Sequence, residues 1–148
     1  MTGVFKISEA GAIALHATGL LAANPNRACR AAEIATSFKV SVAHLEKVMQ
    51  RLARAEVVTA TRGPRGGFQL ARPAGKITLL EVFEAIEGRL TGNQCLLRAR
   101  TCDGTACMLG GMVDRFNKET IDYLSKTTLS EIVNTFINHK TNKETGRK

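Results

Sequence analysis

Apolar residues recur at helical spacing in four segments within residues 1–90. A spacing of three and four residues places such side chains on one face of an amphipathic helix, and a preceding Ser is a common N-cap. The pattern therefore predicts four helices: from Ser8 as N-cap to about Ala23, over residues 31–38, from Ser41 as N-cap to about Ala55, and over residues 78–86.

The third of these segments has two clearly different faces. An apolar face with helical spacing must pack inward, and it consists of Leu45, Val48, Met49 and Leu52. The opposite face is mostly polar and basic, with Ala43, His44, Lys47, Gln50, Arg51 and Arg54. Only Lys39 and Val40 separate this segment from the helix before it. Two short helices joined in this way, the second with a basic outer face, are typical of a helix-turn-helix.

Two β-like runs follow, over residues 57–61 and 67–70. Between them lies Arg62-Gly63-Pro64-Arg65-Gly66, in which Gly and Pro favour a tight turn with the two arginines at its tip. A basic hairpin directly after a recognition helix is the wing of a winged helix, whose arginines reach phosphates or a narrow minor groove. The alternative is a simple surface hairpin.

Residues 89–111 show no helical or strand period and contain three cysteines and four glycines. A long helix is predicted over residues 112–124, as a dimerisation helix, and a final one over residues 129–137. The sequence thus predicts a mainly α fold with a small β-hairpin. Its expected parts are a winged helix-turn-helix over residues 1–88, a cysteine-bearing loop over 89–111, dimerisation helices over 112–138 and a polar tail over 139–148.

Positive charge is concentrated in the predicted DNA-binding part. The whole chain has a net charge of +8, and residues 27–76 hold ten basic against three acidic side chains, a net charge of +7. Such a stretch attracts polyanions such as duplex DNA, although a basic surface without a partner is the alternative. No apolar run is long enough to span a bilayer and no signal peptide is recognisable, so we expect a cytoplasmic protein.

Three of the four cysteines form a spaced cluster, Cys95-x6-Cys102-x4-Cys107. Thiols stay reduced in the cytoplasm, so these three cysteines favour metal or redox chemistry over disulfides. Thiolates bind iron–sulfur clusters and zinc, and these spacings are wider than those of a zinc knuckle. An iron–sulfur cluster, a thiol redox switch and a zinc site completed by Asp103 or a His all remain open. Cys29 stands apart and is predicted to be a small buried residue.

The chain resembles the Rrf-two family of bacterial winged-helix regulators, which includes IscR-, NsrR- and RirA-like members. The resemblance runs from Lys6 to about Val133. It is carried by Val40-Ser41-x-x-x-Leu45-Glu46-x-x-x-x-Arg51-Leu52, the wing with its following Gly67-Phe68, the stretch Ile77-Thr78-Leu79-Leu80-Glu81-Val82, and the three-cysteine loop. It implies a homodimer on a palindromic operator in double-stranded DNA, and an iron–sulfur cluster on each protomer, held by Cys95, Cys102 and Cys107.

Members of the family differ in the fourth ligand of the cluster. Some use a His shortly after the third cysteine, which is absent after Cys107. Others take a carboxylate near the N-terminus of the partner subunit, which makes Glu9 the candidate here and His16 a weaker one. The missing His favours a 4Fe-4S cluster, and because the spacing departs from the family's even five-and-five, a 2Fe-2S cluster is the alternative.

The resemblance also implies a function and a set of DNA contacts. We expect a transcriptional regulator, not an enzyme, that senses redox state, nitric oxide or iron through its cluster. Glu46 resembles a position that reads cytosine. The other expected DNA-contacting residues are Ser41, Val42, Ala43, His44, Lys47 and Arg51 on the recognition helix, with Arg62 and Arg65 on the wing. The alternatives are a zinc-stabilised or cluster-free regulator with a thiol switch and, further away, a thiol redox enzyme.

Overall fold

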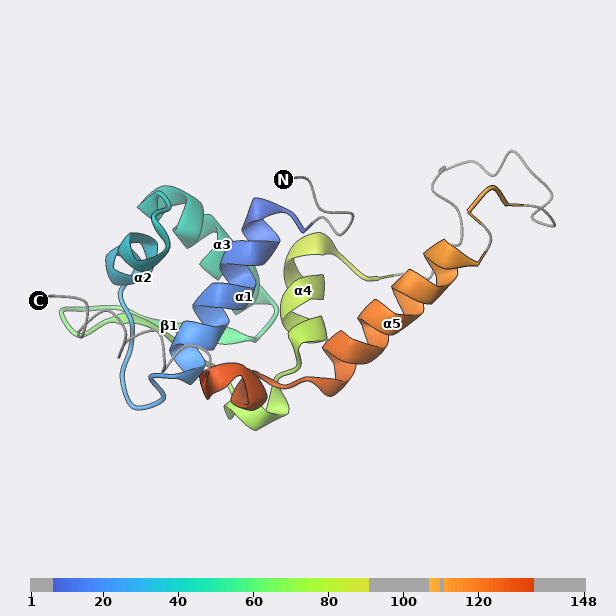
Figure 1. The fold of residues 1–148 in the computed structure, drawn as a ribbon. Coiled ribbons are helices and arrows are strands. Elements are labelled where there is room, and N and C mark those ends of the chain that lie inside the picture. Colours follow the sequence, from blue (N-terminus) through green and yellow to red (C-terminus); the bar gives the residue numbers. More distant parts are fainter. Residues whose placement is uncertain (1–6, 91–106, 110, 135–148) are drawn as a thin grey trace, which may run out of the picture.

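The helix-turn-helix is built from three helices, α1 (Glu9–Ala22), α2 (Ala31–Phe38) and α3 (Val42–Arg54). The computed structural model describes residues 7–90, 107–109 and 111–134. In Figure 1, α1 crosses the middle of the molecule, with α2 and α3 on one side and α4 (Leu79–Glu87) on the other. The three-helix arrangement places α3 at the surface, where one of its faces is free of the core.

Local capping explains where these helices begin and end. The Ser8 hydroxyl accepts a hydrogen bond from the Gly11 N–H at 3.0 Å, and the Ser41 hydroxyl accepts one from the His44 N–H at 3.1 Å. Lys39 ends α2 in the left-handed conformation, with φ of 56°, and so turns the chain into α3. Both predicted N-caps are therefore confirmed, and the tight connection is a single left-handed residue plus Val40.

The wing is a two-stranded antiparallel hairpin of β1 (Val58–Thr61) and β2 (Gly67–Leu70). Its first strand begins one residue later than predicted. Cys29 adds a third backbone segment, since its N–H and carbonyl both exchange hydrogen bonds with Phe68, at 2.9 and 2.8 Å. The Cys29 side chain is fully buried, as predicted. This pairing anchors the wing to the connection between α1 and α2.

A capping box fixes the start of α4. The Thr78 hydroxyl accepts from the Glu81 N–H at 3.2 Å, and the Glu81 carboxylate accepts from the Thr78 N–H at 2.8 Å. Burial raises the pKa of Glu81, but the Thr78 N–H and the Arg72 guanidinium, 2.7 Å away, outweigh it and hold that pKa below its usual value. The carboxylate is thus stabilised in its charged form at neutral pH.

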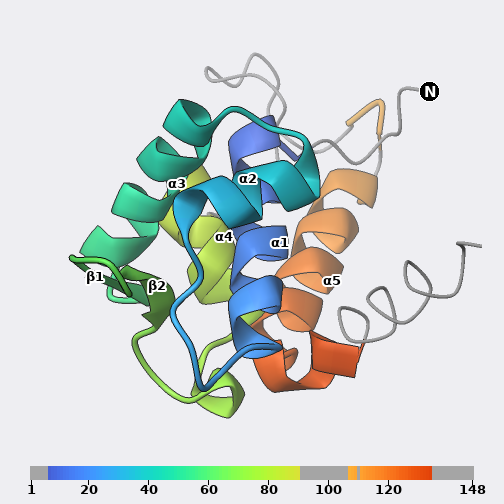
Figure 2. The ribbon, with the colours of Figure 1, turned by 90° about the vertical axis from the view of Figure 1, so that its left-hand side faces the viewer.

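Helix α5 (Met112–Lys126) extends away from the other helices at its N-terminal end and returns to them at its C-terminal end (Figures 1 and 2). A further helix begins at Leu129, as predicted, and is described as far as residue 134. Leu129 is fully buried, and its N–H donates to the Ile77 carbonyl at 2.9 Å. The C-terminal helices are therefore joined to the start of α4. Most of the predicted loop over 89–111, like the tail, lies outside the described residues.

The core is almost entirely aliphatic and lies between α1, α3, α4 and the base of the hairpin. Leu45, Met49 and Leu52 of α3 are completely buried, and Val48 is 2% exposed. The inward face predicted for this helix is confirmed, and it leaves the opposite face to solvent. Among the described helices, none has both the length and the apolar composition that a membrane span requires.

Candidate nucleic-acid interface and cysteine site

The outer face of α3 carries most of the residues expected to contact DNA. Val42, Ala43, Glu46 and Lys47 are all exposed near the start of the helix. Val42 is the most prominent apolar residue of this face and is 42% exposed. The structure thus brings these side chains together on one accessible surface, next to the turn that follows α2.

His44 connects this surface to the start of α1. Its backbone N–H is held by Ser41, whose hydroxyl is therefore engaged as a cap. Its imidazole Nδ1 lies 3.9 Å from the Glu9 carboxylate Oε2, and both side chains remain accessible to solvent. Two residues predicted for different roles, one for DNA and one for the cluster, are therefore direct neighbours.

Arg51 has a different environment from the other predicted DNA contacts. Its guanidinium donates a hydrogen bond to the Ile86 carbonyl in the last turn of α4. A cation at a helix C-terminus is favourable because the final carbonyls carry partial negative charge. Arg51 therefore ties the recognition helix to α4, and its predicted contact with DNA remains a prediction.

The wing presents Arg62 and Arg65 as exposed side chains on either side of Pro64. Arg30, at the N-cap of α2, donates to the Pro64 carbonyl and so holds the turn of the hairpin against the helix-turn-helix. The sequence did not reveal this role of Arg30. Arg30 reaches the turn because the neighbouring Cys29 pairs with Phe68, and no local sequence pattern encodes that pairing.

The cysteine site is described only in part. Cys107 is an exposed free thiol, five residues before α5 begins, whereas Cys95 and Cys102 lie outside the described residues. Cys107 and Glu9 are both exposed. In the part of the chain that the structure describes, no three His, Cys, Asp or Glu side chains gather as a metal site. The full ligand set therefore stays a prediction.

His16, the weaker ligand candidate, is exposed on α1. Its Nδ1 lies 2.7 Å from the Ala12 carbonyl, and its ring meets Phe38 edge to face, with the ring centroids 5.8 Å apart. These contacts hold the imidazole between α1 and the end of α2. They are typical of a helix residue packed at the surface.

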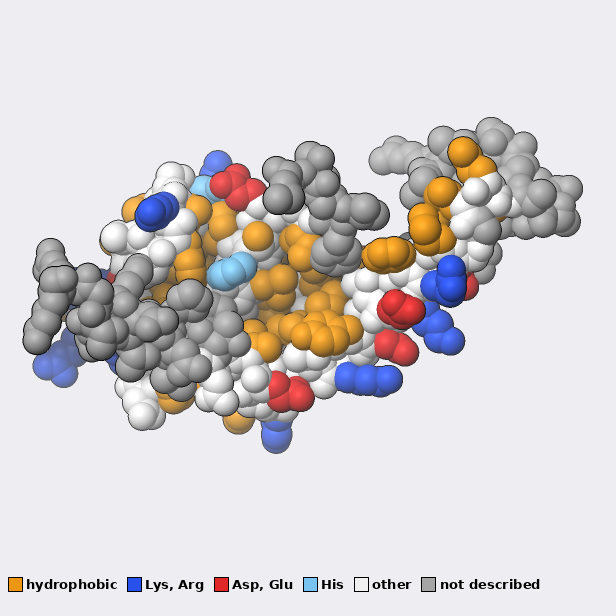
Figure 3. All heavy atoms as spheres, viewed as in Figure 1, with side chains coloured by type: hydrophobic (Ala, Val, Ile, Leu, Met, Phe, Trp, Pro, Cys, Tyr) orange, Lys and Arg blue, Asp and Glu red, His pale blue; other side chains and the backbone are white. Residues whose placement is uncertain are grey.

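Helix α5 exposes large apolar side chains. Met112, Phe116 and Tyr123 are 40%, 47% and 62% exposed, and Leu124 is buried against the core. Figure 3 shows apolar side chains along α5 and across the face beside it. The predicted apolar side of this helix is thus divided, because Leu124 packs inward while Phe116 faces solvent. Exposed apolar surface of this kind is typical of an interaction face.

The fold and these surfaces define a winged-helix DNA-binding protein. The chain belongs to the Rrf2 family, described as iron-dependent transcriptional regulators, whose family model matches residues 7–135. This membership confirms the resemblance inferred from the motifs, and its relatives are transcriptional regulators.

Individual relatives agree with this assignment. A helix-turn-helix transcriptional regulator of Neisseria meningitidis is 33% identical over 129 residues, which cover 86% of this chain and 87% of that protein. The regulator IscR of Klebsiella pneumoniae is 28% identical over 103 residues, covering 70% of this chain and 63% of IscR. Among solved structures, CymR, the global cysteine regulator of B. subtilis, superimposes with a TM-score of 0.76 at 22% identity, covering 89% and 98% of the two chains. The last likeness shows a shared fold.

Proposed function

We propose that this protein is a dimeric transcriptional regulator that senses its signal through an iron–sulfur cluster. Cys95, Cys102 and Cys107 would hold the cluster, and Glu9 of the partner protomer would be the fourth ligand. One observation carries the proposal furthest: the carboxylate of Glu9 lies 3.9 Å from His44 on the recognition helix. A change at the cluster would therefore act on a residue that contacts the DNA-reading surface.

DNA reading would start at the N-terminal end of α3. The major groove admits a helix, and its first outward residues then meet the base edges. Val42, Ala43 and Lys47 are exposed at this end, and Glu46 can accept a hydrogen bond from a cytosine amine. Arg62 and Arg65 of the wing would add contacts to phosphates or the minor groove.

Dimerisation would use the exposed apolar side of α5. Phe116 and Tyr123 present large apolar surfaces there, and a second copy of the chain would cover them. A twofold dimer matches a palindromic operator whose half-sites lie about 34–36 Å apart. A small rotation between protomers would move the two α3 helices out of register with those half-sites.

The cluster would supply a centre that oxidants, nitric oxide or iron shortage can alter. What the chain contributes is the arrangement around it. Cys107 lies just before α5, the proposed dimerisation helix, and Glu9 begins α1 beside α3. A ligand set that joins these elements would couple the dimer interface to the DNA-reading helix. The missing His after Cys107 favours a cluster of four irons, with a cluster of two as the alternative. We also propose a cytoplasmic location.

A thiol switch without a cluster is the second candidate. The exposed thiol of Cys107 favours it, because an accessible thiol is open to oxidation. CymR, which shares this fold, is named as a global cysteine regulator. In this alternative, two of the three cysteines of the loop would form a disulfide.

The experiment is to isolate the protein without oxygen, record its visible spectrum and measure iron and sulfide per protomer. Broad absorption in the blue with equal amounts of iron and sulfide is expected, and their ratio to protein distinguishes four irons from two. The Cys102→Ala variant should stay a folded dimer, lose the colour and change its affinity for operator DNA. A wild-type protein that stays colourless after anaerobic reconstitution with iron and sulfide would overturn the cluster proposal.

A further inference from the structure

A notch lies on the outer face of the wing, beside the connection between α1 and α2. It has a volume of about 470 Å³ and is lined by residues from both segments, among them Asn26, Arg30, Thr61, Arg65 and Gln69. The backbone pairing of Cys29 with Phe68 places the connection beside β2 as a one-residue β-bridge. Because side chains alternate along a strand, those flanking Cys29 point away from the core, toward the notch.

Gly66 lines the notch, and Gly67 follows it at the start of β2. At Gly67 the backbone φ is 153°, and a Cβ there would lie 2.6 Å from the Cys29 carbonyl oxygen. At Gly66 a Cβ would collide with the Thr61 carbonyl oxygen across the turn. Only glycine fits either position, so the three backbone segments approach closely beside the notch.

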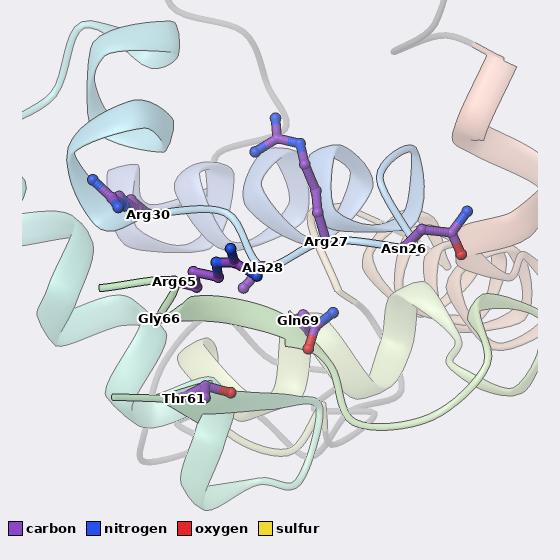
Figure 4. A pocket seen from close by; sticks show the side chains of 8 residues that line it. All are labelled: Asn26, Arg27, Ala28, Arg30, Thr61, Arg65, Gly66 and Gln69. Atoms are coloured by element: carbon purple, nitrogen blue, oxygen red, sulfur yellow. The ribbon is translucent and has the colours of Figure 1, made fainter. Parts of the chain in front are cut away.

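The notch is positively charged. Three of its lining residues are arginines, Arg27, Arg30 and Arg65, and none is acidic. Figure 4 shows Arg65 lying beside the Ala28 segment, with Gln69 and Thr61 on the strands below. Arg27 donates two hydrogen bonds to the Glu33 carboxylate, which compensates its charge, so Arg30 and Arg65 supply the positive charge of the notch.

The notch offers several hydrogen-bond donors: the guanidinium groups of its arginines, the Gln69 amide and the Thr61 hydroxyl. Donors of these kinds suit a phosphate group. The hydrogen bond from Arg30 to the Pro64 carbonyl uses one of the five N–H donors of the guanidinium. The notch also shares Arg65 with the tip of the wing. A DNA strand that the wing contacts would therefore lie close to the notch.

We propose that this notch seats one backbone phosphate of the bound DNA, beside the point where the wing meets the duplex. The inference rests on the proposed DNA binding and adds a contact made by the connection before α2. Phosphate contacts set the register of a protein on the duplex and carry no sequence information. The notch would thus fix the angle of the wing and favour all DNA sequences equally.

The test introduces a negative charge into the notch with little change of shape. Gln69→Glu is nearly isosteric and does not touch the bond between Arg30 and Pro64, whereas Arg30→Gln removes an arginine and that bond together. Ser125→Glu, on the exposed last turn of α5, makes the same change of charge far from the wing. The full chain is titrated with a mixed-sequence duplex of about 30 base pairs, or three helical turns, over a range of salt concentrations.

Gln69→Glu should weaken binding about tenfold, the effect of losing one charge-assisted hydrogen bond. The slope of log affinity against log salt should flatten by about one unit, and the loss should be equal for any duplex sequence. Arg30→Gln should do the same, and Ser125→Glu should match wild type. Unchanged affinity and slope in both notch variants, with wild type binding DNA normally, would overturn the notch alone. A wild type that binds no duplex would overturn the proposed function instead.

A free anion is the other source of a phosphate. Inorganic phosphate is therefore added to wild type and to Gln69→Glu in thermal unfolding. Stabilisation of wild type that is lost in Gln69→Glu, combined with unchanged DNA binding in that variant, would assign the notch to a small anion and overturn the DNA contact.

Discussion

Gly67 offers a sharp test of how the wing is anchored. In Gly67→Ala the new Cβ would lie 2.6 Å from the Cys29 carbonyl oxygen and 2.7 Å from its carbonyl carbon, both of them backbone atoms. A φ of 153° is itself a conformation that only glycine adopts readily, at a cost of about 1–3 kcal/mol for any other residue. To relieve the contact, the Cys29 segment must move away from β2.

That movement breaks two backbone hydrogen bonds, from Cys29 to Phe68 and back, each worth about 1 kcal/mol. Together with the strain, Gly67→Ala should lower the free energy of unfolding by about 3 kcal/mol. At roughly 2–4 °C per kcal/mol for a chain of this size, the melting temperature should fall by about 10 °C. Circular dichroism during heating measures it.

Gly63→Ala is the matched control. Gly63 also has a positive φ, 107°, but nothing lies within 4 Å of the added Cβ. Its cost should therefore be the backbone strain alone, about 1 kcal/mol. The difference of about 2 kcal/mol between the two variants reports the close approach of the Cys29 segment to β2. Equal melting temperatures for the two variants would show that the Cys29 segment does not restrict residue 67.

Other elements give further predictions. The pKa of Glu81 is lower in the folded than in the unfolded protein. The charged carboxylate therefore contributes to the free energy of unfolding above the unfolded pKa of about 4.3, and this contribution is lost as pH falls through the folded pKa. Glu81→Gln should therefore cost about 1 kcal/mol at pH 7 and remove part of the loss of stability below about pH 4.5, measured by urea unfolding. Arg51→Gln loses the hydrogen bond to the Ile86 carbonyl and should lower the free energy of unfolding by about 1 kcal/mol in the same assay. An unchanged unfolding curve would show that this bond does not stabilise the fold. Phe116→Ser should shift the protein from dimer to monomer in sedimentation at micromolar concentration, and an intact dimer would exclude α5 as its interface.

The elements of the winged helix were predictable because local patterns encode them. In α3, the apolar spacing from Leu45 to Leu52 matches the buried face, and Ser41 caps the helix where the sequence indicated. The hairpin followed from Gly63 and Pro64 in the turn. The capped start of the helix at Leu129 also has a local cause, since Glu131 accepts from the Thr128 N–H at 2.6 Å, and this bond lowers the pKa of Glu131.

Contacts between segments far apart in the chain could not be predicted in this way. Arg51 has the helical phase of an outward, DNA-facing residue, yet its guanidinium reaches the end of α4. The pairing of Cys29 with Phe68 joins residues 39 positions apart, and no periodicity signals it. Likewise, Glu9 was predicted as a cluster ligand and His44 as a DNA contact, and only the packing of α1 on α3 makes them neighbours.

The division of α5 has a similar origin. A helical pattern shows that an apolar side exists, but it does not show how much of that side the same chain covers. Leu124 meets the core because the chain turns back at Thr127, whose N–H donates to the Tyr123 carbonyl and whose carbonyl accepts from Leu79. Phe116, two turns earlier, lies beyond that contact and stays exposed.

DNA reading by the exposed face of α3 is tested best by selecting duplexes from a random-sequence pool with the full protein and then measuring its affinity for the enriched sequences. We expect a palindrome with half-sites about one helical turn apart, bound at least about a thousandfold more tightly than mixed DNA. Glu46→Ala should relax the preference at one base pair of each half-site and leave the others intact. A pool without enrichment, or a Glu46→Ala variant with an unchanged preference at every position, would contradict DNA reading by the exposed face of α3.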